Sequence, residues 1–343
     1  GGVQALLYIT TRNDKDAFTA YKALTENVAV DGGKFVPFHL PVFSTEEVLS
    51  FKDKTFGDSI AQILNLFFST HLNGLDVDFA VGRNVLRIVP MFHKVLIGEL
   101  WHNLDGSYDS FFDSLYRIVA DGDDTAKKRT EWFDIAVRIA TLFAVYGQML
   151  NSALIGDDDF FDACFSSDNL SAQMSAWYAR SMGLPIRMII STSEADGSAW
   201  ELVHRGTLNP VTANKDLVSG AERLLHAACG CMTVQKYLCA LSANQIFSIS
   251  DESLHEINSG LFCSVPGNTR SHSVINSVYR SNAYIMDPDT ALNFGGLQDY
   301  RAKTGESKLT VLFAEETPAR YLTQICVATG ANSEKLMEMI NRS

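Results

Sequence analysis

The feature that most constrains the fold is the alternation of short apolar runs with helical patterns after about residue 160. The runs Phe160–Phe165, Ile186–Thr192 and Leu309–Ala314 are short, bounded by polar or turn residues, and typical of buried strands. Helical patterns are expected at 170–182, at 196–205, near Thr290 after the apolar Tyr284–Met286, and from about Pro318. Such an alternation favours a mostly parallel sheet with helices on both faces. The sequence therefore predicts an α/β protein.

The first hundred residues are expected to be mostly helical. A helix is predicted from Asp14 to Asn27, ended by the glycine turn at Asp31–Gly33. Ser44, followed three residues later by Glu47, is a capping-box pattern that opens another helix. From Phe56 to Leu72 the apolar residues recur at helical spacing. Residues 1–98 are therefore predicted to form a helical N-terminal domain.

Charge and cysteine usage exclude several classes of partner. The chain has 28 Lys and Arg against 40 Asp and Glu, a formal net charge of −12, which disfavours nucleic acid and anionic membranes. Its six cysteines lack the spacing of a disulfide framework. The most apolar helical stretch, Trp132–Leu150, is interrupted by Asp134 and Arg138 and is not expected to span a membrane. No signal peptide is visible at the N-terminus, so we expect a cytoplasmic protein.

Seven segments occur in the order of the motifs of one enzyme family. They are Tyr8–Arg12, Asp31–Pro37, Trp177–Ile186, Thr192–Asp196, Glu222–Leu225, Asp287–Ala291 and Pro318–Tyr321. They resemble the motifs Y-I-S-T-R, D-G-G-L-Y-V-P, Y-Y-A-K-R-M-G-L-P-I, T-N-E-N-D, E-R-L-L, D-P-H-T-A and P-A-K-F of threonine synthase. This resemblance implies a pyridoxal-phosphate enzyme of fold type II, with residues 99–343 as a remnant of its large domain.

The resemblance also locates the residue that the family's chemistry requires. Trp101–Ser110 is similar to F-H-G-P-T-L-A-F-K-D, in which the lysine holds the cofactor as a Schiff base. His102 matches the motif, but Asp109 stands at the lysine position. A carboxylate cannot form an imine with an aldehyde. We therefore expect no catalytic residue of this chemistry and loss of the pyridoxal phosphate.

Two further positions of the implied cofactor site depart from the family. The phosphate turn G-N-F-G is matched by Asp168, Asn169, Leu170 and Ser171, so both glycines are lost and a negative charge is added. Asp168 or Asn169 would instead serve as a helix N-cap. Glu315 stands where the family has a threonine that meets the pyridine nitrogen. This change alone would not exclude the cofactor, since a glutamate can bond a protonated pyridine nitrogen.

The implied small domain is also absent from the sequence. The family carries it between the lysine motif and the long helix that starts near Trp132, and it contains an S-G-D-T-G loop that contacts substrate. Here residues 110–131, which include the polar linker Asp121–Asp124, cross this gap, and no similar loop occurs. The small domain is therefore predicted to be deleted.

These departures favour a threonine synthase-like pseudoenzyme that binds a small polar ligand or a protein partner, with a homo-oligomer as one possibility. The expected ligand cleft contains His102, Asp109, Asp168, Asn169 and Ser171. One alternative is an enzyme of altered mechanism that uses His102 or Asp109 as acid or base. Another is a residual threonine synthase with non-covalently bound pyridoxal phosphate. No metal site is expected at His226, Cys229 and Cys231. A site would need at least one further ligand, for which Cys239 is a candidate, and a helix poorly supplies the geometry for residues two apart.

Overall fold

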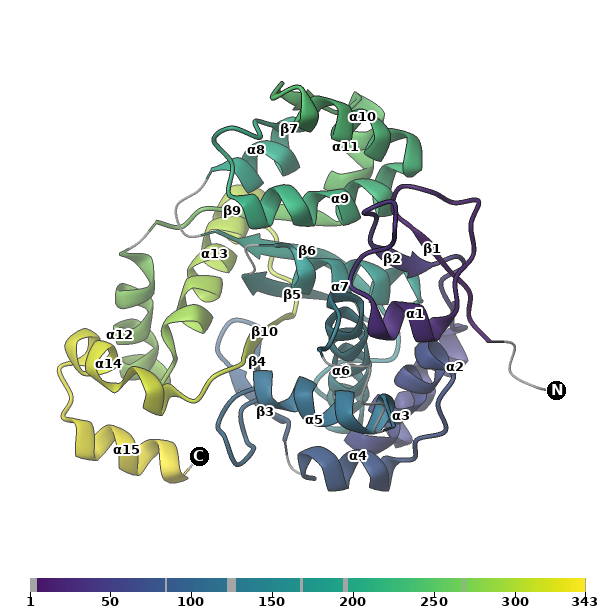
Figure 1. The fold of residues 1–343 in the computed structure, drawn as a ribbon. Coiled ribbons are helices and arrows are strands. Elements are labelled where there is room, and N and C mark those ends of the chain that lie inside the picture. The colour runs from purple at the N-terminus through teal and green to yellow at the C-terminus, as the bar shows by residue number, and fades with distance from the viewer. Residues whose placement is uncertain are drawn as a thin grey trace.

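A computed structural model describes residues 5–83, 85–121, 128–166, 169–193, 197–267 and 269–342. These residues form a central sheet with helices on both faces and a helical lobe at one end (Figure 1). This arrangement confirms the predicted α/β class with a mostly parallel sheet.

The central sheet has six strands in the order β3-β4-β10-β5-β6-β9. The strands are β3 (Arg87–Met91), β4 (Val95–Glu99), β10 (Thr310–Ala314), β5 (Phe161–Ser166), β6 (Ile186–Thr192) and β9 (Leu261–Ser264). All neighbouring pairs are parallel except β3 with β4. Strand β10, the last in sequence, lies between β4 and β5. The carboxyl ends of the parallel strands therefore share one edge, where such sheets bind ligands at the point of strand-order reversal.

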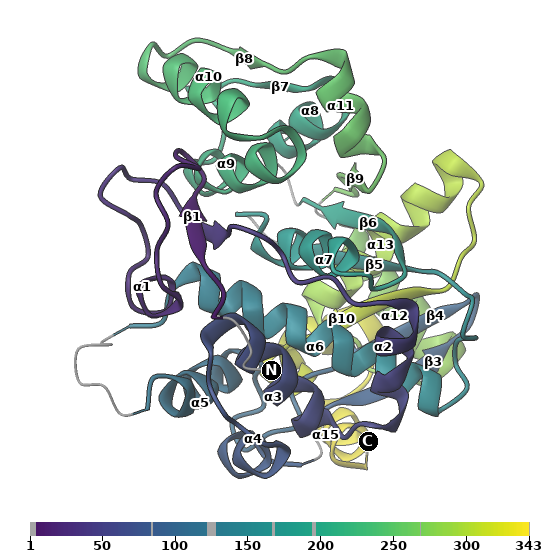
Figure 2. The ribbon, with the colours of Figure 1, turned by 90° about the vertical axis from the view of Figure 1, so that its right-hand side faces the viewer.

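Side chains alternate between two apolar cores because successive strand residues point to opposite faces. Leu96 and Val311 belong to one core, whereas Ile97 and Leu312 belong to the other. Figures 1 and 2 show the helices that cover the two faces. The first face is covered by α3 (Phe56–Phe68), α6 (Glu131–Asn151) and α7 (Ser171–Ser181), and the second by α12 (Arg270–Asn282), α13 (Pro288–Thr304), α14 (Leu322–Thr329) and α15 (Ser333–Arg342).

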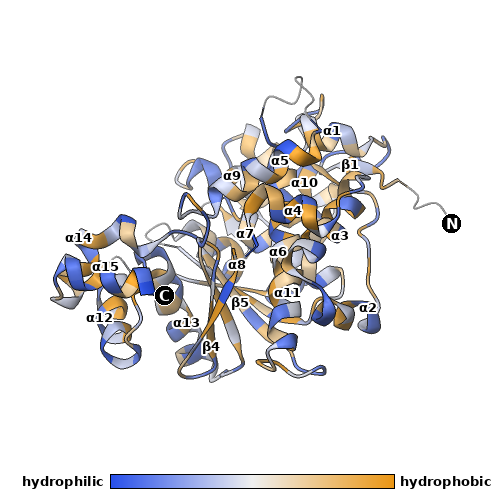
Figure 3. Ribbon diagram, turned by 90° about the horizontal axis from the view of Figure 1, so that it is seen from below, coloured by the Kyte–Doolittle hydropathy of each residue, from blue (hydrophilic) through white to orange (hydrophobic). Residues whose placement is uncertain are grey.

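Helix α6 is the centre of the first face. It is the one described helix that is long and apolar enough to cross a membrane by length and composition, and 83% of its most apolar window is buried inside the protein. In Figure 3, hydrophobic colour is concentrated on the elements packed around α6, whereas α12 and α15 carry long hydrophilic stretches. This burial is that of a core helix.

The remaining elements extend the fold at its two ends. The elements that precede β3 in the chain are β1 (Tyr8–Thr10), α1 (Ala20–Thr25), β2 (Phe35–Pro37), α2 (Thr45–Leu49), a 3-10 turn η1 (Ser50–Asp53) and α4 (Gly74–Val81), in addition to α3. Helix α5 (Asp109–Val119) follows β4. The lobe at the top of Figures 1 and 2 contains α8 (Ser198–Arg205), β7 (Thr207–Leu208), α9 (Lys215–Cys229), α10 (Cys231–Ser242), β8 (Phe247–Ser248) and α11 (Asp251–Asn258). A second 3-10 turn, η2 (Pro318–Tyr321), precedes α14.

Several local predictions agree with the structure. Strand β6 has the predicted bounds, and the helix predicted from Phe56 is α3. Ser44 and Glu47 form the predicted capping box at the start of α2, each side chain accepting the other's backbone N–H. These predictions succeeded because they rest on contacts within a few residues of the chain.

The prediction of a mostly helical first hundred residues missed two strands of the central sheet. Strand β3 is an edge strand that holds Pro90, and β4 is buried on both faces, so neither has the alternation of a half-buried strand. The boundary drawn between residues 98 and 99 falls inside β4.

Two more expectations need correction. The helix predicted over Asp14–Asn27 is only Ala20–Thr25, because Phe18 pairs with Tyr8 and Thr19 caps the helix. The apolar run Tyr284–Met286 has no regular secondary structure and leads into α13. Of the expected linker Asp121–Asp124, residues 122–124 lie outside the described part of the chain.

Candidate functional site

A small acidic cavity of about 120 Å³ lies at the carboxyl ends of β5 and β10. It is lined by Cys164, Phe165, Ser166, Asp287, Asp289, Thr290, Asn293, Phe313, Glu315 and Glu316. Four of these side chains are carboxylates, and no lysine or arginine lines the cavity. Its volume is below the ~300 Å³ at which small-molecule sites usually begin.

Asp287 is the most deeply buried of the four carboxylates. It caps α13 by accepting the backbone N–H groups of Asp289 and Thr290, and the Thr290 hydroxyl donates to it at 2.5 Å. Burial raises the pKa of Asp287 to about 6, although the bonds from Thr290 oppose this shift. The carboxylate is thus occupied as a helix cap.

Glu315 is bound by an arginine of helix α6. The Arg138 guanidinium donates to both Glu315 carboxylate oxygens, with NH2 to Oε2 at 3.0 Å. The same guanidinium lies over the rings of Tyr108 and Phe112, at 5.2 and 5.3 Å from their centroids. The glutamate at the implied pyridine-contact position is therefore engaged in a bidentate ion pair.

Asp109 is the first residue of α5, and its side chain is 70% exposed. Arg129 holds its Oδ1 at 2.5 Å and also pairs with Asp113 at 2.6 Å and Asp134 at 3.0 Å. Burial raises the pKa of Asp134 to about 6, while Arg129 opposes the shift. Asp109 thus belongs to a cluster of three aspartates around one arginine.

The segment that resembles the phosphate turn makes its own local bonds. Asp168 lies outside the described residues, and Asn169 is exposed. The Asn169 side chain accepts the backbone N–H of Ser171 at 3.1 Å, so this amide already has an acceptor. Leu170 has a φ of 59°, a left-handed conformation that a leucine rarely adopts, and its side chain is buried.

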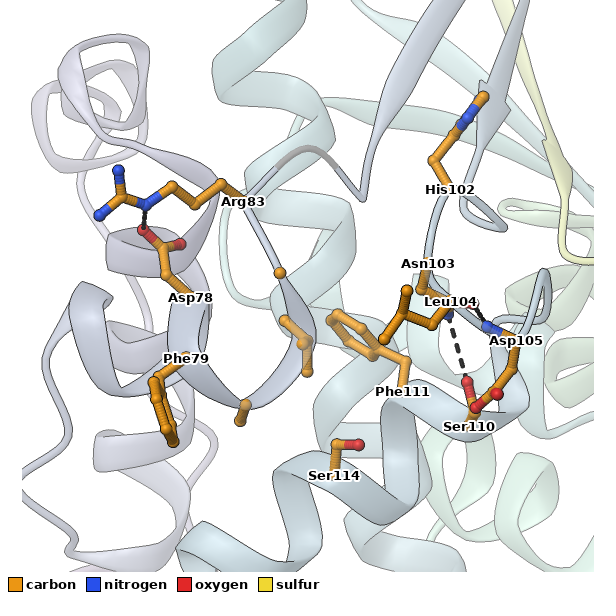
Figure 4. Close-up of a pocket in the computed structure, with 13 residues that line it drawn as sticks. Asp78, Phe79, Arg83, His102, Asn103, Leu104, Asp105, Ser110, Phe111 and Ser114 are labelled. Atoms are coloured by element: carbon orange, nitrogen blue, oxygen red, sulfur yellow. Dashed lines mark hydrogen bonds and ion pairs between the residues drawn. The ribbon is translucent and has the colours of Figure 1, made fainter. Parts of the chain in front are cut away.

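His102 lies beside a second and larger cavity, of about 590 Å³, between α4 and α5 (Figure 4). Its Nε2 is 2.6 Å from a carboxylate oxygen of Glu99, which is buried at the end of β4. The other oxygen of Glu99 accepts the Tyr284 hydroxyl at 2.7 Å. Figure 4 shows Leu104 close to Phe111, with His102 farther from both. A carboxylate that is itself hydrogen-bonded therefore orients the imidazole.

The structure does not bring the predicted cleft residues into one cavity. His102 lines the larger cavity, Asp109, Asn169 and Ser171 line neither of the two, and Asp168 lies outside the described residues. Glu315, at the implied pyridine contact, lines the smaller cavity. The sequence analysis did not identify Arg129, Arg138 or Glu99 as members of the site. A signal for Arg138 was present, since a charged residue within an apolar helix requires a partner.

These residues do not fit pyridoxal phosphate. Asp109 cannot form an imine and is bound to Arg129. Glu315 is paired with Arg138, and four carboxylates surround a cavity too small for a cofactor that carries a phosphate. Within the described residues, no group of three or more His, Cys, Asp or Glu is placed to hold a metal ion.

Comparisons with known proteins agree on one family. Residues 7–81 match the family model described as the threonine synthase N terminus. The chain is 22% identical over 268 residues to "Threonine synthase-like 1" of Pongo abelii. The alignment covers 69% of this chain and 36% of that relative, so the chain spans about a third of the relative's length.

Solved structures with a similar fold include threonine synthases. The pyridoxal-phosphate-bound enzyme of Brucella melitensis superposes with a TM-score of 0.80 at 16% identity, over 99% of this chain and 95% of that one. The yeast enzyme superposes with a TM-score of 0.79 at 14% identity, over 96% and 91%. The N-terminal match, the curated relative and the fold together support a resemblance of this chain to the threonine synthase-like family.

Proposed function

We propose that the chain is a threonine synthase-like pseudoenzyme that has no pyridoxal-phosphate catalysis and acts by binding. The observation that carries the proposal is that two ion pairs occupy the implied cofactor positions. Asp109, at the implied lysine position, is bound by Arg129, and Glu315, at the implied pyridine contact, is bound by Arg138. Both positions of a covalent cofactor site are thus engaged in bonds within the chain.

Two features support the deletion of the small domain as part of this proposal. Helices α5 and α6 are joined by residues 120–130 alone, where the family carries a domain. Phe79 and Leu104, at the rim of the larger cavity, are 95% and 107% exposed. An apolar surface of this kind suits a protein partner or a second copy of the chain.

All six cysteines are unpaired, which supports a reducing compartment such as the cytoplasm.

The test is to incubate the purified chain with pyridoxal phosphate, reduce with borohydride and map the labelled peptides. We expect no absorbance band of an imine and only scattered, substoichiometric labelling of surface lysines. Stoichiometric labelling of one lysine would overturn the proposal. Saturable binding of the cofactor without labelling would instead favour a residual, non-covalent threonine synthase.

A variant that restores the lysine sharpens this test. Asp109→Lys should still give no specific imine, because Glu315, Arg138 and the Asn169 bond remain in place. Asp109→Asn is the matched control, since it removes the same charge without adding an amine. A specific imine in Asp109→Lys would mean that only the lysine was lost.

A second candidate function, an enzyme of altered mechanism, is favoured by the contact between Glu99 and His102. A buried carboxylate that orients a histidine beside a cavity is the arrangement of a general base. This candidate predicts turnover in a screen of ester, amide and phosphoester substrates that is lost in His102→Asn and reduced in Glu99→Gln. A screen without turnover would leave the pseudoenzyme.

A further inference from the structure

A separate cavity of about 420 Å³ lies at the opposite edge of the sheet, beside the amino ends of β5 and β6. The segment 157–160 leads into β5 and forms one wall, and 183–185 leads into β6 and forms another. Helix α2 contributes a third wall through Val48 and Leu49. The volume is within the ~300–1,000 Å³ typical of small-molecule sites.

The cavity combines acidic and apolar lining residues. Asp157, Asp158 and Asp159 line one side, and the apolar residues Leu184 and Ile186 line the other. Asp159 is engaged in a turn, where it accepts the Gly156 N–H at 3.1 Å. Asp157 and Asp158 are exposed and make no hydrogen bond or ion pair within the described residues. Two carboxylates are therefore available to a ligand.

Tyr146 supplies a second, independent sign of a ligand. Its side chain comes from α6, is 1% exposed and stacks on Phe161, yet its hydroxyl has no hydrogen-bond partner among the described residues. Tyr146 lines the cavity. Burial and then the charges of the three aspartates raise the pKa of Tyr146. An unpaired tyrosine hydroxyl at the wall of a cavity is available to bond a ligand.

One cation also lines the cavity, but its charge is directed elsewhere. The Arg180 guanidinium donates to the Ser259 carbonyl at 3.4 Å and lies 6.0 Å from the Trp177 ring. Three aspartates and one arginine leave the lining with a net charge of −2 (−3 + 1). Phe160, whose ring is exposed on the acidic wall, adds an aromatic face.

We propose that this cavity binds a small organic amine in its protonated form. The ammonium group donates to Asp157, Asp158 and the Tyr146 oxygen, and the apolar body lies on Leu184 and Ile186. Carboxylates and an exposed aromatic ring are the groups that recognise organic ammonium ions. The apolar lining residues favour an amine with an apolar body over a fully polar polyamine. This site is distinct from the acidic cavity of the opposite edge and does not depend on the proposed function.

The test is calorimetric titration of the full chain with 2-phenylethylamine and hexylamine, with 2-phenylethanol and hexanol as their neutral analogues. We expect saturable binding of at least one amine and at least about tenfold weaker binding of its alcohol, because a charge-assisted bond is lost. The double variant Asp157→Asn, Asp158→Asn should weaken amine binding by about tenfold or more. Tyr146→Phe should weaken it by about three- to tenfold.

Matched controls separate a local effect from a general one. Glu252→Gln removes an exposed carboxylate from α11, far along the chain, and should leave amine binding unchanged. Tyr146→Phe keeps the ring stacked on Phe161, so its unfolding midpoint should stay close to that of the parent chain. The absence of saturable binding for both amines would overturn the proposal. Equal affinity for amine and alcohol, or unchanged affinity in both site variants, would also overturn it.

Discussion

Two polar networks of this protein use the same chemistry in opposite settings. In the first, the N-terminal residues Thr11 and Arg12 bind Glu222 of α9, at 2.6 and 2.9 Å. In the second, Arg129 and Arg138 bind Asp109 and Glu315 at the implied cofactor positions. The first network begins with residues that match family motifs, whereas the second contains residues that depart from them.

The first network continues to helix α6. Glu131, in the first turn of α6, pairs with Lys34 at 3.1 Å and with Arg223 at 3.2 Å. Arg223 is only 1% exposed and also donates to the Phe35 carbonyl. The matched motifs thus join the N-terminal hairpin, α6 and α9 into one body. These motifs stabilise the fold, so their presence in the sequence is no evidence of activity.

The largest predicted effect comes from the first network. Glu131→Gln should lower the free energy of unfolding by about 3–5 kcal/mol, because it leaves the buried Arg223 and Lys34 without a counter-charge. Urea unfolding measures this difference. Glu252→Gln, on an exposed face, is the charge-matched control and should change stability by less than about 0.5 kcal/mol. A Glu131→Gln effect as small as the control would remove the distinction between the two networks.

The next effect depends on pH and concerns Asp134, in the second network. Its pKa is raised to about 6, so its contribution to stability is complete below about pH 4 and is lost as the pH rises through 6. The parent chain should therefore lose about 1–3 kcal/mol relative to Asp134→Asn between pH 4 and 7. Unfolding both proteins in urea across this range measures the difference. A constant difference would show that burial does not govern this carboxylate.

The sequence predicted the fold better than the site, and the residues show why. Strand β6 and the Ser44 capping box depend on local patterns and were predicted correctly. The pairing of Arg138 with Glu315 joins positions 177 residues apart, so no local pattern contains it. Strand β3 was missed for a related reason. A strand tolerates a proline such as Pro90 when it lies at the edge of the sheet, and the local sequence does not show which strand is at the edge.

The ion pair of Arg138 and Glu315 should contribute less than the first network. A double-mutant cycle with Arg138→Met and Glu315→Gln should give a coupling energy of about 1–2 kcal/mol, because the pair is bidentate but partly exposed. Arg138→Met alone should cost more than Glu315→Gln, since it also removes the contacts with Tyr108 and Phe112. A coupling energy near zero would mean that the pair fills the site without stabilising it.

The smallest effect is expected at Asp109. Its side chain is 70% exposed, so Asp109→Asn should change the free energy of unfolding by only about 0.2–1 kcal/mol, and less at high salt. Asp113→Asn, which breaks the neighbouring contact of Arg129, is the matched control and should behave alike. A residue kept for stability would show a much larger loss than this control. A small and equal effect would mean that the residue at the implied lysine position contributes little to stability. This is the result that the pseudoenzyme proposal predicts.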